Sequence, residues 1–280
     1  MEEYRTHIKA KNGWFDIDLK GLYQYRDLIF LFVKRNFTTK YKQTVLGPMW
    51  LILNPVITVC LYALVFGNIA GLSTDGAPQF VFYLASNAIW SYFAGCITET
   101  SATFTSNAGI LGKVYFPRLV MPISSVVTGV MNLFIQIGIL IIVMIGYVIA
   151  GVRFSIGGAI LFAPVLVLQT ALLGLGCGII IAALTTKYRD LAILVTFGVQ
   201  LWMYASPVVY TVAAVEQSKL YGIYMLNPMA PIIHMWRYAI LGIGTPTMGY
   251  WGISWIVTIV ILFVGVLLFS RIEKTFMDTV

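Results

Sequence analysis

Side chains that could carry out catalysis are few in this chain, and they lie far apart. The two histidines, His7 and His234, belong to no Ser-His-Asp pattern and to no pair of catalytic carboxylates. Cys60, Cys96 and Cys177 lie in apolar segments, without a second Cys or a His at metal-ligand spacing. The phosphate loop G-x-x-x-x-G-K-S/T does not occur. We therefore expect no catalytic residue, no metal site and no nucleotide bound by such a loop.

The composition indicates a membrane protein. Hydrophobic residues make up 59% of the chain and charged residues 10%, and the mean hydropathy is +0.87. A water-soluble domain of this composition would expose large apolar patches. The net charge of +7 follows membrane topology in this chain, so we expect no nucleic-acid partner.

The lengths of the apolar segments predict an all-α polytopic fold. About 20 apolar residues cross a bilayer as a helix, and six segments meet that length. They are 49–70, 79–101, 119–150, 157–184, 191–210 and 251–270. The predicted organisation is a tail with an amphipathic helix over 1–47, followed by a six-helix transmembrane domain over 48–280.

The basic residues predict the orientation. Fifteen of the 18 Lys and Arg residues precede the first span or follow the second, fourth and sixth spans. Only Arg153, Lys219 and Arg237 lie in the opposite loops. The positive-inside rule therefore places both termini in the cytoplasm.

The apolar segment 220–244 is ambiguous, because hydropathy alone would make it a seventh span. Asn227-Pro228 and Pro231 interrupt it, and Arg237 at membrane depth would cost roughly 2.5–3.5 kcal/mol. We predict two short helices that enter the outer leaflet and return, with their irregular backbone covered by protein or lining a wet cavity.

Three features on the cytoplasmic side have alternative readings. Apolar residues recur every three or four positions over 22–40, which predicts an interfacial amphipathic helix that either anchors the chain or contacts a substrate or partner. The loop from Asn107 to Arg118 either docks a partner or only connects two spans. Glu99, near the cytoplasmic end of the second span, either pairs with a nearby cation or forms an electrostatic link to a partner.

Five short strings together resemble a known family. They are LGPMW at 46–50, KVYFPR at 113–118, YRDL at 188–191, SPVVY at 206–210 and NPMAP at 227–231. In this order they resemble the permease subunit of type-2 ATP-binding-cassette (ABC) exporters, in the branch that exports O-antigen, capsule or teichoic acid. The resemblance extends from about Leu28 to Arg271.

The resemblance implies a homodimer in the bacterial cytoplasmic (inner) membrane, with each subunit resting on a separate ATPase that holds ATP and Mg²⁺. The loop 104–117 resembles the coupling helix, the helix 22–40 the cytoplasmic interface helix, and 211–250 the outer gate. The implied residues for coupling to the ATPase are Glu99, Asn107, Lys113 and Arg118.

The implied substrate is a lipid-linked glycan that passes through a channel between the subunits. Lys34 and Arg35 are candidates to receive the lipid headgroup. Sugars present hydroxyls around apolar faces, so aromatic side chains with polar edges suit such a channel. The candidates for the channel and gate are Tyr62, Phe66, Tyr83, Trp90, Trp202, Tyr204, Tyr210 and Trp236. Interfacial aromatic belts are the alternative explanation for any one of them.

Three other functions remain open from the sequence. One is a permease of the same superfamily for a drug or small lipid, and another is a passive channel. A third is a membrane-embedded transferase acting on a polyprenyl-linked glycan. The transferase would need acidic residues to hold a metal, and Glu99 and Asp190 are too few.

Overall fold

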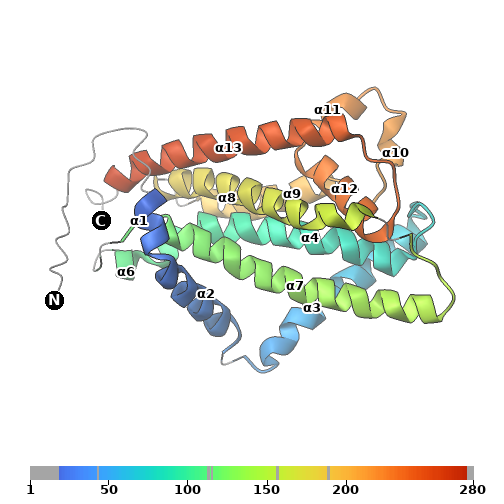
Figure 1. The fold of residues 1–280 in the computed structure, drawn as a ribbon, viewed down its shortest axis with the longest axis horizontal. Coiled ribbons are helices and arrows are strands. Elements are labelled where there is room, and N and C mark those ends of the chain that lie inside the picture. Colours follow the sequence, from blue (N-terminus) through green and yellow to red (C-terminus); the bar gives the residue numbers. More distant parts are fainter. Residues whose placement is uncertain are drawn as a thin grey trace.

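The computed structural model describes residues 19–42, 44–111, 114, 116–155, 158–187 and 190–275. All regular structure in these ranges is helical. Figure 1 shows long helices side by side, with α1, α6 and the end of α13 at one end of the bundle and α10–α12 at the other. The chain is therefore an all-helical bundle with two distinct ends.

Five helical segments are long and apolar enough to cross a membrane, and they confirm five of the six predicted spans. The first is continuous over Gly47–Ile69 and comprises η1 (Gly47–Met49), α3 (Trp50–Tyr62) and the π-helical turn η2 (Ala63–Ile69). The others are α4 (Gln79–Ser101), α7 (Val120–Ile149), α8 (Ala163–Lys187) with the preceding 3-10 turn η3 (Gly158–Phe162), and α13 (Met248–Thr275).

The remaining predicted span, 191–210, is shorter than expected. Helix α9 covers Leu191–Tyr204, and its 14 residues extend about 21 Å, less than the roughly 30 Å of a bilayer core. The helix ends because Pro207 disfavours helical backbone at Ser206 and cannot donate a hydrogen bond itself. The chain then turns, and the Val208 amide bonds to the Ser206 carbonyl at 2.7 Å.

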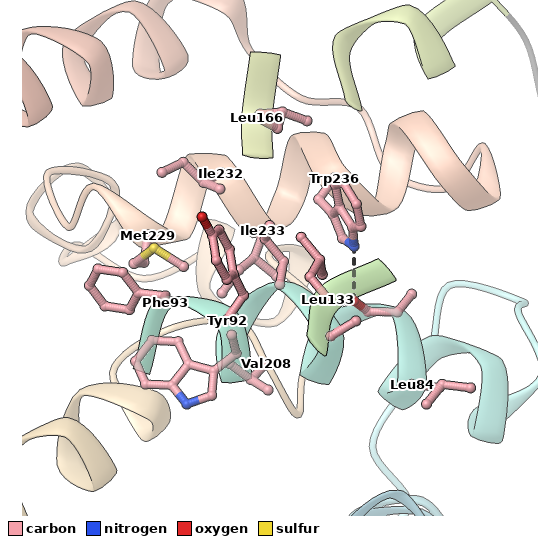
Figure 2. Close-up of a cluster of buried hydrophobic side chains, with 14 of the residues drawn as sticks. Leu84, Tyr92, Phe93, Leu133, Leu166, Val208, Met229, Ile232, Ile233 and Trp236 are labelled. Atoms are coloured by element: carbon pink, nitrogen blue, oxygen red, sulfur yellow. Dashed lines mark hydrogen bonds between the residues drawn. The ribbon is translucent and has the colours of Figure 1, made fainter. Parts of the chain in front are cut away.

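Helix α4 forms the centre of the bundle. Of its most apolar 18-residue window, 78% is buried, compared with 11% for the first span, and it packs against α3, α7, α8, α9 and α12. Figure 2 shows side chains of α12 (Met229–Leu241) directed toward α4, with Ile233 beside Tyr92 and the Trp236 indole pointing to an earlier turn of α4. The core therefore joins α4 to a helix that is not one of the five spans.

Glycines on α8 allow two neighbouring helices to approach closely. A Cβ on Gly178 would lie 2.5 Å from the Cβ of Thr100 on α4, and one on Gly176 would lie 2.8 Å from the Leu262 Cα on α13. Small residues at such positions let membrane helices pack backbone to backbone. These glycines therefore build the interior of one subunit.

A short helical layer covers the end of the bundle where α13 ends (Figure 1). It consists of α1 (Leu19–Gln24) and α2 (Arg26–Tyr41), and α2 packs against α7. Phe32 of α2 is 4% exposed and meets Phe116 with ring centroids 5.8 Å apart. The apolar face of α2 is thus covered by protein, with Phe104, Val120 and Phe269 in the same cluster.

The opposite end carries α10 (Ala213–Glu216), α11 (Tyr221–Met225) and α12. Helix α12 ends at Gly242, whose φ of +70° suits glycine, and a Cβ there would overlap the Ser155 carbonyl oxygen. None of these three helices is long enough to span a bilayer.

Candidate functional site

The first group of predicted site residues meets where α2 reaches the end of α4. The Lys40 Nζ donates a 2.7 Å hydrogen bond to Glu99 Oε1. Glu99 therefore pairs with a cation of its own chain, which is the first of the two readings given above for this residue. The ion pair joins the last turn of α2 to the last turn of α4.

A second contact ties α2 to the predicted coupling loop. Arg35 donates from Nη2 to Asn107 Oδ1 at 2.8 Å, and its guanidinium carbon lies 4.6 Å from the centre of the Phe32 ring. Asn107 follows α5 (Thr103–Ser106) and donates in turn to the Thr103 carbonyl at 2.9 Å. The structure thus brings together a predicted headgroup residue and a predicted coupling residue, whereas Lys34 is exposed on α2.

The coupling loop has a buried side and an exposed side. Phe104 and Phe116 are 2% and 5% exposed, while Thr105, Ser106 and Val114 face outward. Helix α6 (Ala108–Leu111) lies within this loop, between Ser106 and Val114 in the sequence. Arg118 is 8% exposed, so its side chain belongs to the protein interior, and Lys113 lies outside the described residues.

The second group of predicted residues surrounds a pocket at the opposite end. Its volume is about 380 Å³. The lining residues are Trp202, Ala205, Tyr210, Ile223, Tyr224, Asn227 and Pro228. The Tyr210 and Tyr224 rings have centroids 6.3 Å apart, and the Tyr210 hydroxyl donates to the Tyr204 carbonyl at 2.9 Å. Apolar ring faces with nearby polar atoms are the arrangement that sugars favour.

The other predicted aromatics fall into two sets. Tyr62 and Phe66 are partly exposed on the first span, with ring centroids 5.9 Å apart. Tyr83, Trp90 and Trp236 are at most 5% exposed and lie in the core. The Trp236 indole donates to the Ala85 carbonyl at 2.9 Å (Figure 2), so its polar atom is already satisfied. These three rings have no surface on the subunit that a polymer could reach.

One face of α9 carries polar residues that the sequence analysis did not single out. Thr196 and Gln200 are exposed and line a second pocket of about 520 Å³, and Tyr204 follows at the same helical spacing. Asn54, on the first span, is exposed as well. Polar side chains on an apolar helix mark a face that is not directed at lipid. Counting polar residues at four-residue spacing within 191–204 could have revealed this face.

Two basic residues of α12, His234 and Arg237, are buried. Arg237, 2% exposed, donates to the Tyr210 carbonyl at 3.1 Å, and its guanidinium lies 4.5 Å from the centre of the Phe82 ring. Burial, and then the charge of Arg237, lower the pKa of His234 to about 4. His234 is therefore neutral at neutral pH.

These features define a polytopic helical membrane protein. Within the described residues, no group of three or more His, Cys, Asp or Glu is placed to hold a metal ion. Residues 27–241 match the ABC-2 type transporter family. The chain belongs to this family, which makes it a transport protein rather than an enzyme.

Its relatives include two O-antigen export system permease proteins RfbA of Klebsiella pneumoniae. They are 26% and 25% identical over 253 residues, which is 90% of this chain and 94% of each relative. A protein of the same description from Myxococcus xanthus is 28% identical over 217 residues, or 77% of this chain and 80% of the relative.

Proposed function

We propose that this chain is the permease of an ABC exporter that moves a lipid-linked polysaccharide, of the O-antigen type, across the bacterial cytoplasmic membrane. The observation that carries the proposal is the exposed face of α9, where Thr196, Gln200 and Tyr204 lie on an otherwise apolar helix. The relatives named as O-antigen export permeases support the choice of cargo.

The channel forms between two copies of the chain. Ile193, Phe197 and Leu201 are 54–77% exposed on α9, and much of the first span is exposed as well. A bilayer would cover such side chains, but it would leave the amides of Gln200 and Asn54 without hydrogen-bond partners. A second subunit facing these helices would cover the apolar side chains, and a polar polymer between the two subunits would offer hydrogen-bond partners to the amides.

In this proposal the chain crosses the membrane six times. Helix α9 and the turn over 205–210 make the fifth, and the short helices α10–α12 form the re-entrant outer gate within 211–250. Both termini are cytoplasmic, as the basic residues predict. The α1–α2 layer then lies at the inner membrane surface, and the Asn107 loop faces the ATPase.

The path of the polymer joins the two candidate sites. The pyrophosphate of the lipid carrier is received near Lys34 and Arg35. The glycan then passes the partly exposed Tyr62 and Phe66 of the first span, and Tyr204 of α9, toward the pocket at Tyr210. A separate ATPase subunit under each permease binds ATP and Mg²⁺.

The proposal is tested by co-purifying the chain with the ATPase encoded beside it and measuring ATP hydrolysis with and without lipid-linked glycan. We expect a stable complex whose hydrolysis responds to the glycan. A complex indifferent to glycan would point to a drug or small lipid as the cargo. The absence of any ATPase partner would overturn the proposal.

A matched pair of variants tests the channel face in cells. Tyr204, 53% exposed on α9, and Phe134, 66% exposed on α7, are both aromatic and both on the surface. We expect Tyr204→Ala to reduce glycan export and Phe134→Ala to leave it unchanged. Equal export by the two variants would remove α9 from the channel.

A further inference from the structure

We propose that Asn227 and the Pro228 carbonyl form a joint that holds the outer end of α9 against the start of α12 and so keeps the outer gate closed. The inference rests on the proposed transport function, because it assigns to α12 the part of an outer gate. Asn227 is on this view a positioning residue that acts through its hydrogen bonds.

The Asn227 side chain uses its full hydrogen-bonding capacity. Its Oδ1 accepts from Trp202 Nε1 at 2.9 Å and from the Met229 amide at 3.1 Å. Its Nδ2 donates to the Ala205 carbonyl and to Ser206 Oγ, each at 2.9 Å. Three of these four partners belong to the end of α9 and its turn, and the fourth begins α12. Only an amide of this length offers two acceptor and two donor positions here.

The neighbouring residue is tied to a different part of the bundle. The Pro228 carbonyl accepts from Ser254 Oγ of α13 at 2.8 Å. Ser254 in turn accepts from Gln169 Nε2 of α8 at 2.9 Å, and Gln169 Oε1 accepts from Trp251 Nε1 at 2.9 Å. Gln169 and Ser254 are 0% and 1% exposed. A fully satisfied buried network of this kind holds its members in one arrangement.

The two anchors therefore differ in mobility. Helix α12 is buried along most of its length, whereas Met203 is the one residue of α9 that is buried. Because α9 is packed on one side only within the subunit, we infer that it can tilt, while hydrogen bonds from α8 and α13 hold Pro228 in place. A tilt of α9 would pull on Asn227 through its three hydrogen bonds to Trp202, Ala205 and Ser206. Asn227 is adjacent to Pro228, whose carbonyl is held by Ser254. Asn227 also lines the aromatic pocket, so cargo that displaces Trp202 acts on the same joint.

The experiment measures closure of the outer gate without using the exported polymer. The full permease with its ATPase partner is reconstituted in liposomes without nucleotide, and the efflux of trapped sucrose is followed. We expect Asn227→Ala to raise efflux several-fold over the unaltered protein. Trp202→Phe removes one of the four bonds and should raise it less. The double variant should leak no faster than Asn227→Ala alone.

The matched control is Gln136→Ala. Gln136 of α7 is also a partly buried amide that bridges two helices, through hydrogen bonds of 2.9 and 3.1 Å with Ser91 of α4. It lies away from the joint, so its loss should lower the thermal unfolding temperature without raising efflux. Efflux from Asn227→Ala no higher than from Gln136→Ala would overturn the proposal.

A smaller substitution decides the matter if Asn227→Ala does not fold. Ser206→Ala removes a single hydroxyl from the joint, and efflux above the Gln136→Ala level would support the proposal, whereas tight vesicles would overturn it. Sucrose efflux is independent of the cargo. If Asn227→Ala vesicles leak and ATP hydrolysis by the complex does not respond to glycan, the proposed joint is supported and the proposed polysaccharide cargo is rejected.

Discussion

Lys40 and Glu99 lie 59 residues apart in the sequence and are joined by a hydrogen bond of 2.7 Å. The Lys40 side chain is 46% exposed and that of Glu99 32%, so the pair adds at most about 1 kcal/mol to stability. Its consequence is positional, because it fixes the end of α2 to the end of α4, just before the coupling loop.

A charge exchange tests whether this position matters. We expect Glu99→Gln to reduce export while shifting the unfolding temperature only slightly, since an exposed ion pair contributes little. Adding Lys40→Glu to Glu99→Lys restores the attraction with reversed signs and should recover part of the export, as measured in cells. If the exchanged pair exports no better than either single variant, the contact has no coupling role.

Arg35 separates a headgroup role from a coupling role. Arg35→Lys keeps the positive charge, but a compact ammonium does not reproduce both the bond to Asn107 and the stacking on Phe32. We expect Arg35→Lys to lower glycan-dependent ATP hydrolysis as Asn107→Ala does, with no further loss in the double variant. Full activity of Arg35→Lys would indicate that the charge alone matters and favour the headgroup role.

Gly178 tests the packing of α8 on α4. Gly178→Ala places a Cβ 2.5 Å from the Thr100 Cβ, and overpacking of this kind costs about 1–3 kcal/mol. Gly138→Ala on α7 meets no atom within 4 Å and gains helix propensity of up to about 1 kcal/mol. The unfolding temperature measured in detergent should therefore fall for Gly178→Ala and stay the same or rise for Gly138→Ala. The reverse order would contradict the described packing.

His234 predicts an acid-sensitive stability. Its pKa is 6.5 when unfolded and about 4 when folded, so below pH 6.5 the unfolded chain binds the proton first. Stability should then fall by up to about 1.4 kcal/mol per pH unit between those values. Above pH 6.5 His234 is neutral in both the folded and the unfolded chain, so its titration causes no loss of stability there.

The control for this titration is His234→Gln, which does not ionise. Unfolding temperatures measured between pH 7.5 and about 5, above the usual range of carboxylates, should fall more steeply for the unaltered protein than for the variant. Parallel curves would show that His234 is not the titrating group.

Much of the fold was predictable because it depends on local composition. Five spans lie where apolar length placed them, since a bilayer demands about 20 apolar residues from each helix. The end of α9 was predicted at 210 but lies at Tyr204, because the turn at Ser206-Pro207 is itself apolar and hydropathy cannot detect it.

The candidate site was only partly predictable. Glu99, Asn107, Trp202 and Tyr210 were candidates from residue type, position and the family resemblance, whereas Lys40 and Asn227 were assigned no role. Both gain their importance from partners distant in the sequence, such as Asn227 and the Trp202 indole. No local pattern encodes such pairs.

The sequence by itself determined that this chain is a helical membrane protein of the ABC-2 type, because hydropathy, charge placement and short motifs are properties of the linear chain. Tertiary structure alone decided which aromatics are buried and which are exposed. Tyr83 and Trp236 lie in the core, whereas Tyr204 lies on the surface. The physical reason is that helices apolar on all sides carry no signal of which face packs inward, so only contact with neighbouring helices makes that choice.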